Sequence, residues 1–179
     1  MSDTTPSILS VISSDLQSEL SVQEVIELDK TLRRIRSSSP GAMVLHHGCS
    51  TGTYSADARA HEFAWDSGWR IEGHPAFAVG GVEPRQLPRV RKQLSVLHPT
   101  ERLSDRDASL IWTADIVVAV RPRLSQTKAL LAEAAAIGWQ VILINAPGPG
   151  RPAVPAQAES VEPIDWTPRI HNYLVHEHR

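Results

Sequence analysis

The feature that most constrains the fold is the alternation of short apolar runs with segments of helical periodicity. Runs rich in apolar or β-branched residues lie at 7–13, 42–46, 69–73, 115–120 and 140–144. Helical spacing of apolar residues fills most of the intervals between them. This alternation is typical of a parallel sheet that is covered by helices on both faces. We therefore expect an α/β fold in which the last four runs are adjacent parallel strands.

Capping signals predict where the helices begin. Ser21 and Glu24 have the Ser-x-x-Glu spacing of a capping box, in which each side chain satisfies a free backbone donor of the other residue. Ser55 or Asp57 could cap the second helix. Two further helices are expected at 104–113 and 125–137.

The overall charge and the cysteine content narrow the range of partners and compartments. The 179 residues carry a formal net charge of −2, and the sequence pI is near 6.4, which argues against nucleic acid and anionic membranes as partners. Cys49 is the single cysteine, so an intramolecular disulfide is excluded and a reducing cytoplasm is the expected location. No apolar run reaches the roughly 20 residues that span a bilayer, so no membrane association is expected.

The chain divides near residue 145. Residues 1–145 carry the alternating pattern, whereas 146–179 begin with a stretch rich in proline, glycine and alanine that is typical of a linker or tail. The last residues of this tail could dock a short helix on the body. Residues 75–102 contain four prolines and a group of basic residues. We interpret them as a long excursion from the domain.

Three polar clusters follow predicted strands, at 46–57, 74–75 and 121–127. The carboxyl ends of parallel strands meet at one edge of a sheet, and ligands bind beyond that edge. The first cluster has the parts of a phosphate cradle: Gly48 and Gly52 permit close backbone approach, hydroxyl side chains surround them, and a helix begins at the end. The alternative is a simple turn between a strand and a helix.

The other polar residues could bind a metal, cap a helix or contact nucleic acid. No metal site is expected at His46, His47 and Cys49, because neighbouring residues of a strand point to opposite faces. Asp57 either caps the second helix or accepts a hydrogen bond from a ribose hydroxyl. The basic residues of 85–102 have no interleaved aromatic residues, which argues against a stacking platform for nucleic acid.

Six short motifs occur in order along the chain: His-His-Gly-Cys at 46–49, Ala-Asp-Ala-Arg-Ala-His-Glu at 56–62, Gly-Trp-Arg-Ile at 68–71, His-Pro at 74–75, Arg-Asp at 106–107 and Ala-Asp-Ile-Val-Val-Ala at 114–119. The series resembles the SLOG superfamily of small bacterial and phage proteins. These are Rossmann-like relatives of the Lonely Guy phosphoribohydrolases and of DNA-processing protein A. The resemblance covers residues 40–145. It implies a Rossmann-like three-layer sandwich with a mostly parallel sheet, a pocket for a nucleotide or nucleotide derivative, and a homodimer.

The chain departs from the Lonely Guy enzymes where their catalytic glutamate would stand. In those enzymes a PGGxGTxxE motif binds phosphate and supplies the glutamate, and the matching stretch here is residues 122–130. Its glycines are replaced, and Leu130 occupies the position of the glutamate. A leucine neither moves a proton nor stabilises an oxocarbenium-like centre. Glu62 and Glu133 are the remaining candidate acids for catalysis.

These observations together predict a protein that binds a nucleotide or nucleotide-derived ligand, with little or no catalysis and no cofactor. The alternative is an N-glycosidic hydrolase or transferase that acts on a nucleoside phosphate, and a DNA-binding module is disfavoured by the pI. The expected ligand-binding residues come from the polar clusters and from the Arg-Asp motif: His47, Gly48, Cys49, Ser50, Thr51, Gly52, Asp57, His74, Arg106, Arg123, Ser125 and Thr127.

Overall fold

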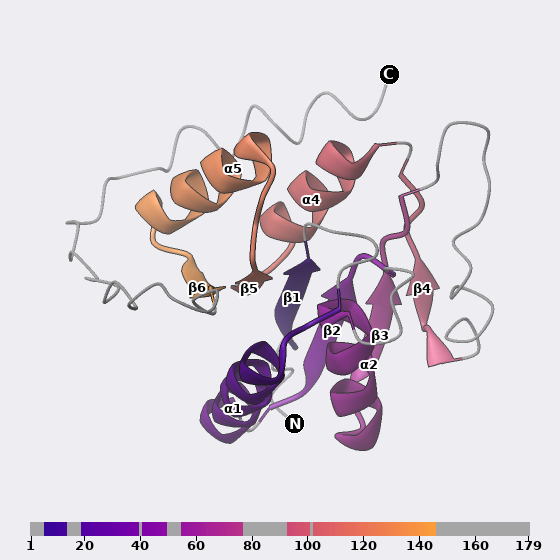
Figure 1. The fold of residues 1–179 in the computed structure, drawn as a ribbon. Coiled ribbons are helices and arrows are strands. Elements are labelled where there is room, and N and C mark those ends of the chain that lie inside the picture. The colour runs from indigo at the N-terminus through magenta and orange to yellow at the C-terminus, as the bar shows by residue number, and fades with distance from the viewer. Residues whose placement is uncertain are drawn as a thin grey trace.

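The computed structural model describes residues 6–13, 19–39, 41–49, 55–76, 93–100 and 102–145. These residues form a six-stranded sheet in which all neighbouring strands are parallel (Figure 1). The strands are β1 (Ser7–Ser13), β2 (Met43–His47), β3 (Arg70–Gly73), β4 (Val96–Leu97), β5 (Ile116–Val120) and β6 (Gln140–Ile144). The described helices are α1 (Val22–Ser38), α2 (Ala56–Asp66), α4 (Leu103–Trp112) and α5 (Ser125–Ala136).

Helices cover both faces of the sheet, so the predicted three-layer α/β architecture is confirmed (Figure 1). On one face, Leu32 of α1 and Ala60 of α2 join Leu9 of β1 in an apolar cluster. On the other face, Leu110 of α4 and Leu131 of α5 form a second cluster against the sheet. Among the described helices, none has the length and apolar character that crossing a membrane requires.

β1 lies at the centre of the sheet, whose strand order is β4-β3-β2-β1-β5-β6. The expectation that 42–46 and 115–120 form neighbouring strands is therefore wrong, because β1 separates β2 from β5. Leu9 of β1 is in register with Leu45 on one side and with Ile116 on the other. The C-terminal five residues of β1 are buried. A strand without access to water needs a neighbour on each side to pair its backbone groups.

The position of β1 creates a switch point in the topology. From β1 the chain passes through α1 to β2 and then moves outward to β3 and β4. It returns through α4 to β5, on the opposite side of β1, and ends in β6. In open parallel sheets the crevice beyond the carboxyl ends of the strands at such a point is where ligands bind.

The helix starts agree with the capping signals. In α1 the Glu24 backbone N–H donates to Ser21 Oγ at 3.3 Å, and the Ser21 N–H donates to the Glu24 carboxylate at 2.7 Å. At the start of α2, Ser55 Oγ accepts from the Ala58 N–H at 3.2 Å. Ser55, and not Asp57, is therefore the capping residue of α2.

The excursion at 75–102 contains a strand that the sequence pattern does not reveal. β4 pairs with β3, and Glu72 is in register with Val96. A strand of two residues is too short to show a period of two, so periodicity alone cannot detect it. The part of the excursion at 77–92 and the predicted tail at 146–179 lie outside the described residues.

The central position of β1 predicts a large effect of shortening its side chains. Leu9 is fully buried, whereas Leu143 on the edge strand β6 is 54% exposed. We expect Leu9→Ala to lower the free energy of unfolding by about 2–5 kcal/mol because it leaves a cavity. Leu143→Ala, the control, should change it by no more than about 0.5 kcal/mol. Urea unfolding followed by circular dichroism measures both, and equal losses would contradict the assignment of β1 to the core.

Candidate functional site

The carboxyl ends of the central strands bring together several of the predicted ligand-binding residues. His47, Gly48 and Cys49 end β2 and begin the loop 48–57, and His74 follows β3. The backbone N–H of His74 donates to the carbonyl of His47 at 2.8 Å, which ties these two strand ends together. Arg106, from the first turn of α4, packs against Gly48. Ser50, Thr51 and Gly52 lie outside the described residues.

A buried ion pair lies beneath this edge of the sheet. Arg106 and Asp107 are 1% and 0% exposed. The Nε and Nη2 groups of Arg106 donate to Asp107 Oδ1 at 2.9 and 2.6 Å. Nη2 also donates to the carbonyl of Ser13 at 3.2 Å, and Thr127 Oγ1 donates to Asp107 Oδ2 at 2.6 Å. The pair thus fastens α4 to the end of β1 and to the first turn of α5.

One nitrogen of the Arg106 guanidinium is not used in this network. Nη1 is buried and has no hydrogen-bond partner among the described residues. Gly48 lies directly against it: a Cβ built on Gly48 would approach Nη1 to 2.9 Å and the Cδ and Cζ of Arg106 to 3.0 Å. Because a side chain at residue 48 would displace the guanidinium, this position requires glycine.

A chain of hydrogen bonds starts at Cys49. Its backbone N–H donates to His47 Nδ1 at 3.1 Å, and His47 Nε2 contacts His61 Nδ1 of α2 at 3.0 Å. His61 Nε2 contacts Gln93 Oε1 at 2.6 Å. Burial lowers the pKa of His47 to about 3, and burial also lowers the pKa of His61. His47 is therefore a neutral imidazole at pH 7, and its hydrogen bonds fix one tautomer.

A second group of histidines occupies the opposite face of the sheet, since His46 and His47 alternate along β2. His74 Nε2 contacts His46 Nδ1 at 2.9 Å, and Ser109 of α4 contacts His74 Nδ1 at 3.2 Å. His46 Nε2 lies 3.6 Å from the Glu72 carboxylate. Burial lowers the pKa of His74 to about 3 and also lowers the pKa of His46. Both rings thus serve as neutral hydrogen-bonding groups.

Two exposed basic side chains satisfy the buried Glu72. His98 Nε2 lies 2.8 Å from Oε2, and Arg70 Nη2 lies 2.8 Å from Oε1. Both oxygens of the Glu72 carboxylate are therefore paired with basic groups. In the described part of the chain, no group of three histidine, cysteine or acidic side chains is arranged to hold a metal ion.

The thiol of Cys49 is not an activated nucleophile. Burial and the neighbouring Asp57 carboxylate raise its pKa to about 12, so the reactive thiolate is scarce at pH 7. The backbone of Cys49 has φ of 53°, in the left-handed region that residues other than glycine rarely adopt. Asp57 is 1% exposed in the first turn of α2. Cys49 and Asp57 are therefore buried polar residues at the edge of the sheet, and the thiol is not set up for nucleophilic chemistry.

The remaining predicted residues lie on the surface. Arg123 and Ser125 are exposed at the start of α5. The candidate acid Glu62 is exposed on α2, 3.4 Å from Arg59, and Glu133 is exposed on α5. Neither acid is within the hydrogen-bonded networks at the carboxyl ends of the strands. Leu130 packs against the apolar cluster between α4 and α5.

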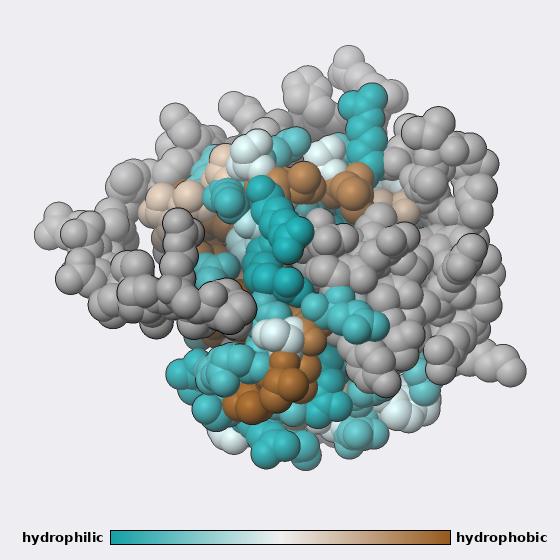
Figure 2. Space-filling model, in the orientation of Figure 1, coloured by the Kyte–Doolittle hydropathy of each residue, from teal (hydrophilic) through white to brown (hydrophobic). Residues whose placement is uncertain are grey.

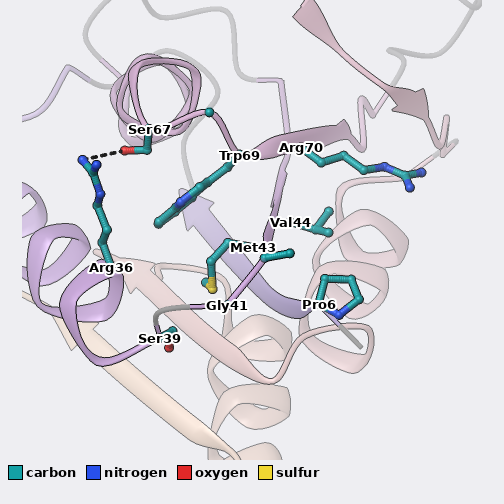
Figure 3. A pocket seen from close by; sticks show the side chains of 11 residues that line it. Pro6, Arg36, Ser39, Gly41, Met43, Val44, Ser67, Trp69 and Arg70 are labelled. Carbon is teal, nitrogen blue, oxygen red and sulfur yellow. Dashed lines mark hydrogen bonds between the residues drawn. The ribbon is translucent and has the colours of Figure 1, made fainter. Parts of the chain in front are cut away.

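Two surface hollows lie away from the predicted ligand-binding residues. One of about 600 Å³ is at the amino ends of β2 and β3, where Trp69 lies between the ends of α1 and α2 (Figure 3). In this hollow Arg36 donates to Ser67 Oγ at 3.4 Å. The other, of about 530 Å³, lies between α1 and α2. Most of the coloured atoms in Figure 2 are hydrophilic, and an apolar patch lies over α1. Val22 and Ile26 of this helix are exposed.

Sequence reasoning missed several partners of the predicted residues. His61 and Asp107 occur in the motifs, yet their contacts with His47 and Thr127 could not be deduced from their spacing. Gln93 gives no sequence signal, because it lies in the excursion without periodicity. For the buried ion pair of Arg106 and Asp107, the Arg-Asp motif is the signal that the sequence offers.

The fold recurs in solved structures, although no protein-family model and no curated protein matches the sequence. The molybdenum cofactor carrier protein from Chlamydomonas reinhardtii is 16% identical with a TM-score of 0.54, over 78% of this chain and 76% of that one. A second structure of that carrier gives 15% identity and a TM-score of 0.53.

DNA processing protein A from Streptococcus pneumoniae is 14% identical with a TM-score of 0.57, over 79% of this chain. The match spans 51% of the DNA processing protein, about half of its length. The chain thus shares the Rossmann-like fold of these two proteins, and a Rossmann-like fold is what the motif series implies.

The buried neutral histidines make the stability of the fold depend on pH. His47 and His74 have their pKa lowered to about 3, whereas an unfolded histidine titrates near about 6.5. Between these values the unfolded chain binds more protons, so the free energy of unfolding falls as the pH drops below about 6.5. Each of the two histidines contributes a slope of about 1.4 kcal/mol per pH unit.

Urea unfolding at pH 7, 6 and 5 measures this slope. The variant His47→Gln should show a shallower dependence than the wild type, because one depressed pKa is removed. An identical slope in the two proteins would contradict a neutral, buried His47.

Proposed function

We propose that the protein binds a nucleotide or a nucleotide-derived ligand beyond the carboxyl ends of β1, β2 and β5, with little or no catalysis. The observation that carries this proposal is the buried Arg106, whose Nη1 has no hydrogen-bond partner among the described residues. The loop 48–57 and the turn 121–127 are proposed to form the two sides of this site. They follow β2 and β5, the strands on either side of β1, which supports the proposal.

The energetics of Arg106 favour an anionic ligand. A buried donor without an acceptor costs about 1–3 kcal/mol, and more when the group is charged. A phosphate oxygen that accepts a hydrogen bond from Nη1 would recover this free energy on binding. The contact of Gly48 with Arg106 brings the backbone of the loop within reach of the same oxygen. Glycine therefore serves both the guanidinium and the ligand.

The other proposed contacts follow from the places of the polar side chains. Arg123 and Ser125 are exposed at the start of α5, where a phosphate can reach them. Arginine binds phosphate through two parallel hydrogen bonds, which compensates for the glycines that this turn lacks. Thr127 supports the site indirectly through Asp107. His74 and Asp57 are proposed to contact the sugar or base.

Two observations support binding rather than turnover. Leu130 stands where the related phosphoribohydrolases have their glutamate, and the candidate acids Glu62 and Glu133 are exposed on helices. In addition, a structural neighbour is a carrier protein for a cofactor, which is a binding function. We further propose a cytoplasmic homodimer, the assembly and location that the sequence led us to expect.

Filling the space beside Arg106 tests the site. Gly48→Val should weaken the binding of AMP, measured by isothermal titration calorimetry, at least tenfold, because the new side chain displaces the guanidinium. Gly41→Val is the matched control, since a Cβ at Gly41 meets nothing within 4 Å. Circular dichroism establishes that both variants are folded. Equal affinity in Gly48→Val and the wild type would show that the loop is only a turn.

A second experiment separates a binder from a hydrolase. The wild-type protein, incubated with the common nucleoside monophosphates, should release no base above the rate without protein, as followed by chromatography. Arg123→Ala should weaken nucleotide binding several-fold, because one phosphate contact is lost. Release of base that disappears in Glu62→Gln or Glu133→Gln would instead establish the N-glycosidic hydrolase.

A further inference from the structure

We propose that His61 is a positioning residue for the backbone of Cys49, at the point where the chain leaves β2. It acts through His47, whose tautomer it sets. The inference deepens the proposed ligand-binding function and rests on it for the link to affinity. Its structural part, the control of Cys49 by His61, is tested without a ligand.

The hydrogen bonds of this chain can run in one direction only. Because the Cys49 N–H donates to His47 Nδ1, the proton of the neutral His47 must be on Nε2. That Nε2–H donates to His61 Nδ1 at 3.0 Å, which places the proton of His61 on Nε2. The Nε2–H of His61 then donates to the amide oxygen of Gln93 at 2.6 Å. Each group fixes the donor or acceptor role of the next.

The first bond of the chain holds an unfavourable conformation. Cys49 has φ of 53°, which costs a residue with a Cβ of the order of 1 kcal/mol or more. Its N–H points to a buried ring nitrogen, so loss of that acceptor would leave a buried donor unsatisfied. Without the His47 acceptor, a change of the Cys49 backbone out of the left-handed region lowers its conformational free energy.

The chain also connects the two ends of the loop. His47 is the last residue of β2, before the loop, and His61 belongs to α2, which follows it. Their ring contact is buried and joins residues 14 apart in sequence. The bond therefore fixes the end of β2, and with it the start of the segment at Cys49, relative to α2.

The hydrogen-bonded chain ends at Gln93, near the surface. His61 and Gln93 line the hollow of about 530 Å³ between α1 and α2. His61 is 3% exposed and His47 is 1% exposed, and of the two only His61 lines this hollow, so a proton from solvent reaches His61 first. The titratable and charged groups around His61 come from three elements: His47 of β2, Arg33 and Arg36 of α1, and Arg59, Glu62 and Asp66 of α2.

Protonation of His61 is incompatible with the chain as it stands. A doubly protonated His61 presents an N–H at Nδ1, so His47 Nε2 must become an acceptor and its proton must move to Nδ1. Nδ1 then faces the Cys49 N–H as a second donor, and their bond is lost. Burial lowers the pKa of His61, so this state forms below the ordinary range of histidine. The backbone of Cys49 is therefore held by His47 at neutral pH and loses this hydrogen bond in acid.

Cys49 supplies a probe for the test, because it is the single cysteine of the chain. The protection factor is the rate at which iodoacetamide alkylates Cys49 in the urea-unfolded protein, divided by the rate in the native protein at the same pH. Because both rates are measured at one pH, the factor does not follow the change with pH in the thiolate fraction of the unfolded chain. In His61→Leu, which removes the acceptor for His47, this factor should fall at least tenfold at pH 7.5. His61→Gln should restore most of it, because the amide oxygen accepts the same hydrogen bond.

The control and the pH profile distinguish positioning from general destabilisation. Asp66→Asn, on the same helix and hollow but outside the chain, should keep the wild-type factor. The wild-type factor should fall as the pH drops from 7 to 5, and the fall should be smaller in His61→Leu, where only the general loss of stability through His47 and His74 remains. Gln93→Glu should move the fall to higher pH, since a carboxylate stabilises the protonated His61. A factor in His61→Leu equal to that of the wild type would overturn the proposal.

Nitrogen-15 spectra of the wild-type histidines test the proposal even if the leucine variant does not fold. At pH 7.5 the proton of His47 should be on Nε2, and a proton on Nδ1 would overturn it. AMP affinity, measured in parallel, should fall with the protection factor in His61→Leu. If the wild type binds neither AMP nor other nucleotides while the thiol results hold, the proposed ligand fails and the positioning role of His61 stands.

Discussion

The structure depends above all on the buried pair of Arg106 and Asp107. Its hydrogen bonds reach the carbonyl that ends β1 and the hydroxyl of Thr127 in α5, so one charge pair joins the centre of the sheet to two helices. Removal of one partner from such a pair costs about 3–5 kcal/mol, because the other charge is left buried. The pair also sets the function that we propose, since it holds the guanidinium against Gly48 with one nitrogen available. Stability and binding thus rest on the same side chain.

Around this pair the edge of the sheet is polar but carries little net charge. The four buried histidines are neutral at pH 7 because burial lowers their pKa, and Asp107 balances the charge of Arg106. Such an edge suits the proposed ligand through directed hydrogen bonds more than through a strong positive field. A neutral imidazole can donate at one nitrogen and accept at the other, so each ring transmits the orientation of its neighbour. This property allows α2 to influence a backbone group at the end of β2.

The comparisons place the chain among proteins of one fold with different roles, a cofactor carrier and a DNA processing protein. At identities of 16% and 14% the shared property is the arrangement of strands and helices, not the ligand. The distinguishing features must therefore be sought in the residues at the switch point. Here these are a glycine packed on a buried arginine and two opposed groups of histidines. The proposed binding function rests on these residues.

Local features of this protein were determined by the sequence by itself. The alternation of apolar runs and helical segments predicted the parallel sheet, and the Ser-x-x-Glu spacing predicted the start of α1, because both depend on residues a few positions apart. Only the tertiary structure decided that β1 is central, that Ser13 meets Arg106 across 93 residues, and that His61 contacts His47. Periodicity records which face of an element is buried, but not which element covers it. The partner of a buried polar group is chosen by packing, and therefore the sequence could point to polar residues that follow the strands but not to the hydrogen bonds between them.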